Sequence, residues 1–262
     1  MKWRKSWQRR FYNLLWIGIW LGEGCHSNQA GEGTLPSLDT TTQAAVERLS
    51  KDYAQEASVW RGEMARFLRP AVFRIEVRVR HKYRTDRYSG TGWAAENGYI
   101  WTCRHLFPID GALDIEIWDY MGKLRKGRLV WRDSIVDAVL LQVDYSPERW
   151  LSLKLDSFPD VGETIYSMGA PMGLLGTLQE GFVAAEARYF QSRVEEAYPF
   201  LQLSLPAQPG SSGSPVVDRS GRVIGMISDI ASVSGEYEGI SFAIPAQVLH
   251  QVWERYRSFA SK

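Results

Sequence analysis

Cysteine is nearly absent from this chain of 262 residues, which contains only Cys25 and Cys103. Cys25 closes an N-terminal apolar run and Cys103 lies in a strand-like segment, so the pair gives little support for a disulfide framework. Histidine is also scarce, with four residues. We expect Cys103 to be a small buried residue, and we expect no bound metal and no other cofactor.

An excess of charge is also missing. Lys and Arg total 31 against 30 Asp and Glu, a formal net charge of +1, so we expect no nucleic-acid partner. The basic run from Arg78 to Arg87 is interpreted as a solvated strand end and loop. Hydrophobic residues make up 45% and aromatic residues 13%, which is typical of a folded globular protein.

No apolar run is long enough to cross a membrane comfortably. The basic segment "MKWRKSWQRR" is followed by the apolar "FYNLLWIGIWLG", about a dozen residues. This order matches the charged and apolar regions of a secretory signal peptide, with a surface or buried helix as the alternative. We therefore interpret residues 1–30 as a signal peptide or a lipoprotein or membrane-anchor signal, and expect export to the periplasm or cell envelope.

The segment "LGEGC" leaves lipidation of Cys25 open. Gly24 is the small residue that lipoprotein signals place before their cysteine. Leu21 lies four residues before Cys25 rather than three, and Glu23 is unusual there. Lipidation and cleavage at another position therefore both remain open, as does membrane anchoring through the N-terminus.

Helical periodicity is confined to the two ends of the remaining chain. Residues 31–42 are predicted to be a linker and residues 43–68 an amphipathic helix, with an apolar residue every seven positions. Those residues are Val46, Tyr53, Trp60 and Phe67. The helix could lie on the domain or form a coiled-coil contact in a homo-oligomer. "AQVLHQVWERYRSF" predicts a second amphipathic helix at the C-terminal end.

Between Val72 and Ile244 the pattern is that of short strands. "AVFRIEVRVR" alternates apolar and charged residues, which predicts a half-buried strand. Similar segments follow, and "ENG" and "DRSGR" are typical of hairpin turns. Many short strands without intervening helices predict a β-barrel or β-sandwich.

One Gly/Ser segment, "QPGSSGSPVVDRSGRVIG", lies between core-forming strands rather than between domains. A serine there needs a base to act as a nucleophile. His105 is the only histidine that follows a strand-like apolar stretch and leads into a turn. Asp137 precedes the apolar strand "AVLLQV", where it could orient that base or simply cap the strand.

Together these segments resemble the trypsin-like serine peptidases. "TGWAAENGYIWTCRHLF", "DAVLLQV" and "PGSSGSPVV" are similar to the family's His, Asp and Ser segments, in that order. "FLRPAVFRIEV", "YSMGAPMGLLGTLQEGFVAA" and "GISFAIPAQVL" resemble the HtrA/Deg branch, so that the similarity covers Phe67 to Val252, about 70% of the chain. The resemblance implies an all-β domain over residues 69–257, with two six-stranded barrels of the chymotrypsin type, an N-terminal helix and a C-terminal helix.

The resemblance also assigns roles. His105 would be the general base, Asp137 its orienting partner and Ser212 the nucleophile. The backbone N–H groups of Gly210 and Ser212 would form the oxyanion hole, and the Ser228 hydroxyl would support Asp137. The family's loop reads Gly-Asn-Ser-Gly-Gly-Pro. This chain departs from it by carrying serine at positions 211 and 214.

The substrate pocket that the resemblance implies has no carboxylate placed to pair with a substrate Lys or Arg, unless a loop folds Asp229 or Glu236 inward. Pro206, Ala207 and Gly239 occupy its predicted floor and walls, which favours an apolar substrate residue before the cleaved bond. The partners expected are therefore protein or peptide substrates. Relatives of the HtrA type carry PDZ domains after the peptidase, but only about ten residues follow the last helix motif here, so we expect the peptidase domain alone, without PDZ.

Two functions follow from this pattern. The first is an exported serine endopeptidase that hydrolyses peptide bonds in unfolded or exposed protein segments through an acyl-enzyme. The alternative is a catalytically weak or inactive module of trypsin fold that holds client proteins. Labelling with a serine-directed phosphonate, with and without His105→Ala, distinguishes the two.

Export gives the first testable prediction. The mature protein should lack the segment up to residues 24–30, or retain it as an anchor. Mass spectrometry of the protein from its native cell envelope measures this, and a diacylglyceryl mass on Cys25 identifies the lipoprotein form. A cytosolic chain that retains Met1 would contradict both versions.

Overall fold

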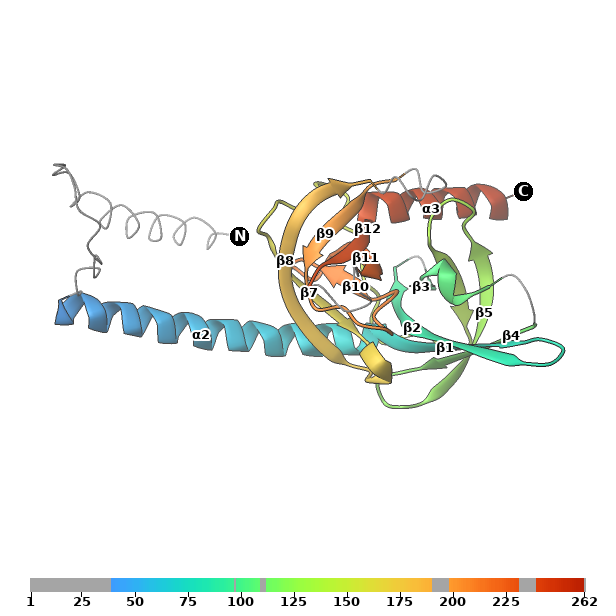
Figure 1. The fold of residues 1–262 in the computed structure, drawn as a ribbon, viewed down its shortest axis with the longest axis horizontal. Coiled ribbons are helices and arrows are strands. Elements are labelled where there is room, and N and C mark those ends of the chain that lie inside the picture. The colour runs from blue at the N-terminus through green and yellow to red at the C-terminus, as the bar shows by residue number, and fades with distance from the viewer. Residues whose placement is uncertain (1–38, 97, 109–111, 190–197, 231–238, 262) are drawn as a thin grey trace, which may run out of the picture. The chain divides into compact units, whose positions relative to one another are not determined.

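The computed structural model describes residues 39–96, 98–108, 112–189, 198–230 and 239–261. The chain divides into two compact units, residues 1–51 and residues 52–262. Within the described part of the larger unit, the strands close into two six-stranded antiparallel barrels (Figure 1). The predicted all-β class with two barrels and a helix on either side is confirmed. The predicted signal segment, with Cys25, lies outside the described residues.

Each barrel is a closed ring of six strands. The first has the spatial order β1-β2-β3-β6-β5-β4 and the second β10-β11-β12-β9-β8-β7. The first-barrel strands are β1 (Val72–Arg80), β2 (Thr85–Ala95), β3 (Tyr99–Thr102), β4 (Ala112–Trp118), β5 (Leu124–Arg132) and β6 (Val139–Val143). The second-barrel strands are β7 (Thr164–Gly169), β8 (Thr177–Arg188), β9 (Phe200–Ser204), β10 (Pro215–Val217), β11 (Val223–Ile230) and β12 (Ser241–Pro245).

Strand β1 shows how the apolar pattern builds the first barrel. Phe73, Ile75, Val77 and Val79 are fully buried, whereas the charged residues between them are partly exposed. Each buried side chain of this size contributes about 1.5–3 kcal/mol relative to exposure. The alternation therefore sets which face of β1 turns inward, as the sequence predicts.

Strands β10 and β11 form a hairpin that positions two of the predicted site residues, Ser212 and Ser228. The "DRSGR" turn joins them, with the Asp218 backbone N–H donating to the Arg222 carbonyl at 3.0 Å. The Asp218 carboxylate also accepts from the backbone N–H of Ser220 at 2.8 Å. Gly221 adopts a φ of +80° in this turn, a conformation that favours glycine. The loop that ends at β10 contains Ser212, and β11 contains Ser228.

Helix α2 (Thr40–Leu68) begins three residues before the predicted start at residue 43. The reason is a side-chain cap, because one Asp39 oxygen accepts from the backbone N–H groups of Thr41 and Thr42 at 2.9 Å each. The last three residues of the predicted linker, residues 40–42, therefore belong to the helix.

The apolar residues of α2 are mostly exposed. Within residues 52–68, Met64 and Leu68 are the fully buried ones, so that packing is limited to the last turns. Within residues 52–68, the exposed apolar residues are Tyr53, Val59 and Trp60. The coiled-coil contact stays a prediction. In the described part of the chain, no helix combines the length and apolar character needed to cross a membrane.

Helix α3 (Ala246–Ala260) confirms the predicted amphipathic helix and ends three residues beyond the predicted domain end at residue 257. Val248, Val252 and Tyr256 are buried on one face, as predicted. The helix packs on β11 and β12 of the second barrel (Figure 1). The Tyr256 ring also contacts Tyr99 and Trp131 of the first barrel, with ring centroids 5.3 and 5.8 Å apart. Helix α3 thus joins the two barrels.

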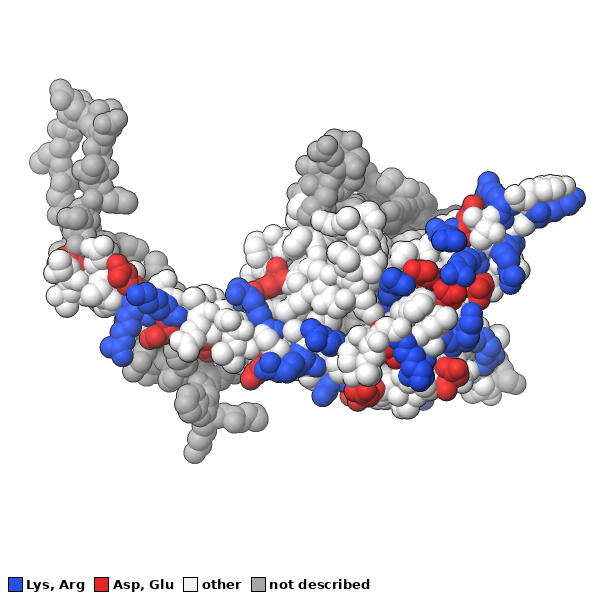
Figure 2. All heavy atoms as spheres, turned by 90° about the horizontal axis from the view of Figure 1, so that it is seen from below, with Lys and Arg blue, Asp and Glu red and all other residues white. Residues whose placement is uncertain are grey.

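The basic run from Arg78 to Arg87 forms the end of β1, a turn and the start of β2. Several of its charges are paired within the barrel. Arg78 binds Glu116 at 2.9 Å, and Arg84 binds Asp86 at 3.1 Å. Figure 2 shows Lys and Arg interspersed with Asp and Glu on the face in view, rather than a continuous basic surface. The interpretation as a solvated strand end and loop agrees with these pairs.

Candidate active site

His105 lies on a tight turn immediately after β3. The chain leaves the strand through Cys103, which is extended, and enters the 3-10 turn η2 (Arg104–Leu106). Leu106 and Cys103 are buried on either side, so that the turn is anchored by its apolar residues. The His105 side chain remains 46% exposed. Its position combines a fixed backbone with access to solvent.

Asp137 lies in the loop before β6, and its carboxylate accepts three hydrogen bonds. The His105 ring Nδ1 lies 2.8 Å from Oδ2, and the His105 backbone N–H donates to Oδ1 at 2.8 Å. The Ser228 hydroxyl donates to Oδ2 at 2.6 Å. The Asp137 backbone N–H is also bonded, because the Tyr198 hydroxyl accepts from it at 3.1 Å. The structure thus brings together the predicted residues His105, Asp137 and Ser228.

These donors keep the carboxylate ionised although its side chain is only 7% exposed. Burial alone would raise the pKa of Asp137, but the bonds and charge of His105, with the Ser228 hydroxyl, lower it to about 2. An ionised carboxylate can only accept hydrogen bonds, so the His105 proton must be on Nδ1. The neutral ring therefore carries its lone pair on Nε2, as a general base requires.

The exposure of the three loop serines separates them. Ser211 and Ser214 are each 1% exposed, whereas Ser212 is partly exposed. The Ser211 hydroxyl accepts from the Gln208 backbone N–H at 3.1 Å. The Ser214 hydroxyl is buried and has no hydrogen-bond partner among the described residues. Ser212 is therefore the serine that a substrate can reach.

The backbone before Ser212 makes a turn that sets the direction of the Gly210 N–H group. The Pro209 carbonyl accepts from the Met172 backbone N–H at 2.7 Å. Because a trans peptide directs its C=O and N–H oppositely, the Gly210 N–H points away from Met172. Gly210 has a φ of +98°, and a Cβ there would lie 2.5 Å from the Ala170 carbonyl oxygen. This position therefore requires glycine.

Met172, whose N–H donates to the Pro209 carbonyl, has an unusual backbone conformation. It lies in the 3-10 turn η3 (Pro171–Gly173) with a φ of +53°. A non-glycine residue in the left-handed region is uncommon and costs about 1–3 kcal/mol. Surrounding bonds hold the turn, including the Gly173 N–H to the Ala170 carbonyl at 2.9 Å. The strained residue, Met172, is therefore the one whose N–H holds the loop that carries Ser212.

Thr91 of β2 is a buried link between this loop and the first barrel. Its hydroxyl donates to the Gly210 carbonyl at 2.8 Å and accepts from the Ala170 N–H at 2.9 Å. Its backbone N–H donates to the Ser212 carbonyl at 2.8 Å. Sequence reasoning did not single out Thr91 or Tyr198. Thr91 lies within the quoted segment "TGWAAENGYIWTCRHLF", but no local signal marks its hydroxyl.

The turn that carries His105 and the loop that carries Ser212 approach each other closely at Gly90, where there is no room for a side chain. A Cβ on Gly90 would collide with Leu106 and would lie 2.9 Å from the Ser212 carbonyl oxygen. The Ile227 carbonyl accepts from the Gly213 N–H at 2.7 Å and from the Cys103 thiol at 3.2 Å. The two segments are therefore fixed to each other through Gly90 and Ile227.

Cys103, His105 and Asp137 also form a cluster whose ligand atoms lie within 4.8 Å of one another. Their polar atoms already bond within the protein, the thiol to the Ile227 carbonyl and the imidazole to the carboxylate. Burial raises the pKa of the Cys103 thiol well above its ordinary value, which opposes the thiolate that a metal would need. The cluster is better suited to proton transfer than to metal binding.

The predicted pocket residues are placed only in part. Ala207 is fully buried, and Pro206 is exposed with its carbonyl accepting from the Gln179 side-chain amide. Gly239 is exposed with a φ of +77°. Residues 231–238, which precede Gly239, lie outside the described residues.

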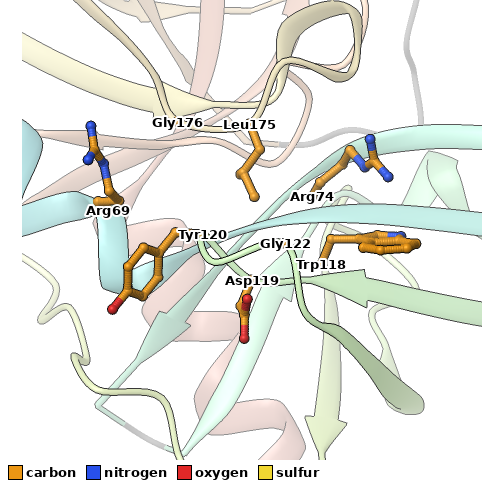
Figure 3. A pocket seen from close by; sticks show the side chains of 8 residues that line it. All are labelled: Arg69, Arg74, Trp118, Asp119, Tyr120, Gly122, Leu175 and Gly176. Carbon is orange, nitrogen blue, oxygen red and sulfur yellow. The ribbon is translucent and has the colours of Figure 1, made fainter.

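A separate hollow of about 400 Å³ lies beside η3 and contains none of the predicted site residues (Figure 3). The Arg74 guanidinium lies 5.1 Å from the centre of the Trp118 ring and donates to the Gly173 carbonyl at 3.4 Å. In Figure 3, Leu175 points into the hollow between Arg74 and Tyr120. The Tyr120 hydroxyl donates to Glu148. The wall of this hollow supports the turn that holds the Pro209 carbonyl.

Comparison with known proteins gives consistent matches. The family model described as "Trypsin-like peptidase domain" matches residues 90–226. A Halomonas elongata protein named "Probable periplasmic serine endoprotease DegP-like" is 34% identical over 67% of this chain and 36% of its own length. A protein of the same name from Pseudomonas savastanoi is 32% identical over 65% of this chain and 35% of its own length.

A solved structure titled "Crystal structure of the serine endoprotease from Yersinia pestis" shares the fold. Its TM-score is 0.60 at 25% identity, covering 75% of this chain and 66% of that chain. The chain spans about a third of the length of the curated relatives it matches.

The lowered pKa of Asp137 predicts a pH-dependent contribution to stability. With a folded pKa of about 2 against an ordinary 3.8, the ionised form is favoured in the folded state. This contribution is full above about pH 4 and is lost as the pH falls towards 2. The difference in unfolding free energy between wild type and Asp137→Asn should therefore shrink by roughly 2 kcal/mol over that range.

Urea unfolding of both proteins at each pH measures this difference, since effects of acid common to both cancel. A difference that stays constant between pH 4 and pH 2 would show that the carboxylate gains nothing from its three donors.

Proposed function

This chain belongs to the trypsin-like peptidase family, and on that premise we propose that it is a serine endopeptidase of the periplasm that cleaves unfolded or exposed protein segments. The names of its relatives support the reaction and the compartment. The observation that carries the proposal is the bonded set of His105, Asp137 and Ser228 next to a loop that exposes only Ser212 of its three serines.

The residues take the following roles in acylation. The Ser212 hydroxyl attacks the carbonyl carbon of the peptide bond while His105 Nε2 accepts its proton. The ionised Asp137 holds the Nδ1 proton and stabilises the imidazolium that forms. The N–H groups of Gly210 and Ser212 bind the negative oxygen of the tetrahedral intermediate. When the C–N bond breaks, His105 returns its proton to the amine that leaves.

Deacylation repeats these steps with water. His105 accepts a proton from the water that attacks the acyl-enzyme carbonyl carbon, and the same two N–H groups bind the oxygen. Collapse breaks the ester bond, and the proton returns to the Ser212 oxygen. No step uses a metal or another cofactor.

The first prediction from this mechanism assigns the nucleophile. Ser212→Ala should lower peptide hydrolysis by ~10⁴-fold or more because it removes the attacking oxygen. Its melting temperature should hardly change, since a partly exposed hydroxyl contributes little to packing. Initial rates on an unfolded protein substrate, with thermal unfolding alongside, measure both quantities.

Ser214→Ala is the matched control. It removes a hydroxyl that has no described partner, so we expect activity close to wild type. Loss of activity in Ser214→Ala with activity kept in Ser212→Ala would show that the nucleophile is misassigned. A wild type that binds unfolded proteins but neither cleaves them nor reacts with a serine-directed phosphonate would instead establish the non-catalytic module.

The second prediction concerns specificity. Pro206, Ala207 and Gly239 offer no carboxylate to a substrate Lys or Arg, and burying such a cation unpaired costs several kcal/mol. We therefore expect cleavage after aliphatic or small aromatic residues, with neighbouring side chains discriminated by only ~1–3 kcal/mol. Profiling of cleavage sites in a denatured protein library tests this. Dominant cutting after Lys or Arg would refute the apolar pocket.

A further inference from the structure

The loop that carries Asp137 is organised around a second buried carboxylate, that of Asp133. This loop runs from the end of β5 at Arg132 to the start of β6 at Val139. The Asp133 side chain is 0% exposed. Its Oδ1 accepts from the backbone N–H groups of Ile135 at 3.0 Å and Val136 at 2.8 Å. The carboxylate therefore fixes the two residues immediately before Asp137.

The charge of Asp133 is matched by a residue far along the chain. Arg255 of helix α3 donates from Nε to Oδ2 at 2.8 Å and from Nη2 to Oδ1 at 3.0 Å. Two parallel bonds from one guanidinium fix orientation as well as distance. Burial alone would raise the pKa of Asp133, but Arg255 and the two backbone N–H groups lower it below its ordinary value. Asp133 thus stays ionised and bonded to Arg255.

The same loop is bonded to the turn that carries His105. The Asp133 backbone N–H donates to the Ala138 carbonyl at 3.1 Å, which closes the loop on either side of Asp137. The Arg104 guanidinium donates to the Asp133 carbonyl at 3.0 Å, and Arg104 is the residue before His105. Asp133 therefore lies between Arg255 and both members of the His105–Asp137 pair.

The position of Arg255 is fixed by the packing of α3. Its neighbours Val252 and Tyr256 are buried on the helix face that contacts the barrels. The Tyr256 and Tyr99 hydroxyls share a hydrogen bond of 2.8 Å. The Arg255 side chain is 33% exposed, so one side of the guanidinium is open to solvent while the other meets Asp133. A helix held in this way can serve as a rigid support for the loop.

We propose that Arg255 is a positioning residue for catalysis, which through Asp133 holds the Asp137 carboxylate against His105. This inference rests on the proposed function. Without the guanidinium, the buried Asp133 charge would draw in water or a proton, and the N–H groups of Ile135 and Val136 would lose their fixed acceptor. The Asp137 carboxylate would then no longer be held in line with Nδ1 of His105.

The central variant is Arg255→Met, which keeps the length of the side chain and removes both donors. We expect kcat to fall ~10–100-fold, the size of effect that a small misplacement of a catalytic group produces. KM should change less than kcat, because Pro206, Ala207 and Gly239 lie in loops of the second barrel, whereas the loop of Asp133 and Asp137 joins β5 and β6 of the first. Rates are expressed per active site, titrated to completion with a serine-directed phosphonate, so that unfolded protein does not count.

Two further variants control for charge and for the helix. Arg255→Lys keeps the charge but cannot make both bonds, so it should recover part of the lost activity. If Arg255→Met does not fold, Arg255→Lys carries the test, with a loss of at least ~3-fold in kcat expected. Arg257→Met removes an exposed ion pair to Glu254 on the same helix, at 3.1 Å, and should retain wild-type activity.

A double-mutant cycle separates positioning from general destabilisation. The rate of Ser212 phosphonylation is measured for wild type, Arg255→Met, Asp137→Asn and the double variant. If Arg255 acts through Asp137, its loss should have little further effect once Asp137 is replaced. A role only in stability would lower the rate by the same factor in both backgrounds.

The outcomes are distinguishable. A wild type that neither cleaves substrate nor reacts with the phosphonate overturns the proposed function, and this inference with it. An active wild type with full activity in Arg255→Met overturns the inference alone, as do equal effects of Arg255→Met in both backgrounds of the cycle. A loss in kcat that disappears in the Asp137→Asn background supports the inference.

Discussion

The buried carboxylate of Asp137 is the constraint on which the rest of the site depends. A carboxylate removed from water is costly unless hydrogen-bond donors replace its hydration. Here those donors come from both barrels, His105 from the turn after β3 and Ser228 from β11. The two barrels must therefore meet at one fixed separation for the Asp137 carboxylate to keep these donors and remain ionised. The orientation of His105 follows from that requirement, because its ring is bonded to the same oxygen as Ser228.

The loop that carries Ser212 depends on the same junction. Thr91 of the first barrel bonds to Gly210, Ala170 and Ser212, all of which belong to the second barrel or its loops. Met172 holds the Pro209 carbonyl from the other side. The carbonyl groups of Pro209, Gly210 and Ser212 are therefore each held by a hydrogen bond, which restricts the backbone of this loop. The turn that carries His105 and the loop that carries Ser212 are thus positioned by one interface between the barrels.

The sequence predicted the two-barrel fold and marked His105, Asp137 and Ser212 as candidate site residues, because these signals are local. Alternation along β1, the turn residues before Ser212 and the apolar strand after Asp137 each occupy a few consecutive positions. Tyr198 and Arg255 could not be found in this way, since they contact the Asp137 loop from 61 and 122 residues away along the chain. The exposure of Tyr53 and Trp60 was also not predictable, because a heptad pattern shows that a face is apolar but not what covers it.

The loop departs from the family's pattern by carrying serine at positions 211 and 214. These two serines are buried, whereas Ser212 between them is partly exposed. Ser211 and Ser214 are buried and bonded through their backbones, with the Ser214 N–H donating to the Ser211 carbonyl and the Ser214 carbonyl accepting from the Ile227 N–H, both at 2.9 Å. Their burial fixes the backbone on either side of Ser212. A buried hydroxyl with no partner among the described residues, as at Ser214, carries an energetic cost of about 1–3 kcal/mol. The loop tolerates that cost because the backbone bonds of Ser214 do not depend on its side chain. Ser212 is then the one serine of the loop whose side chain is not held in the core, so its hydroxyl is left available for chemistry.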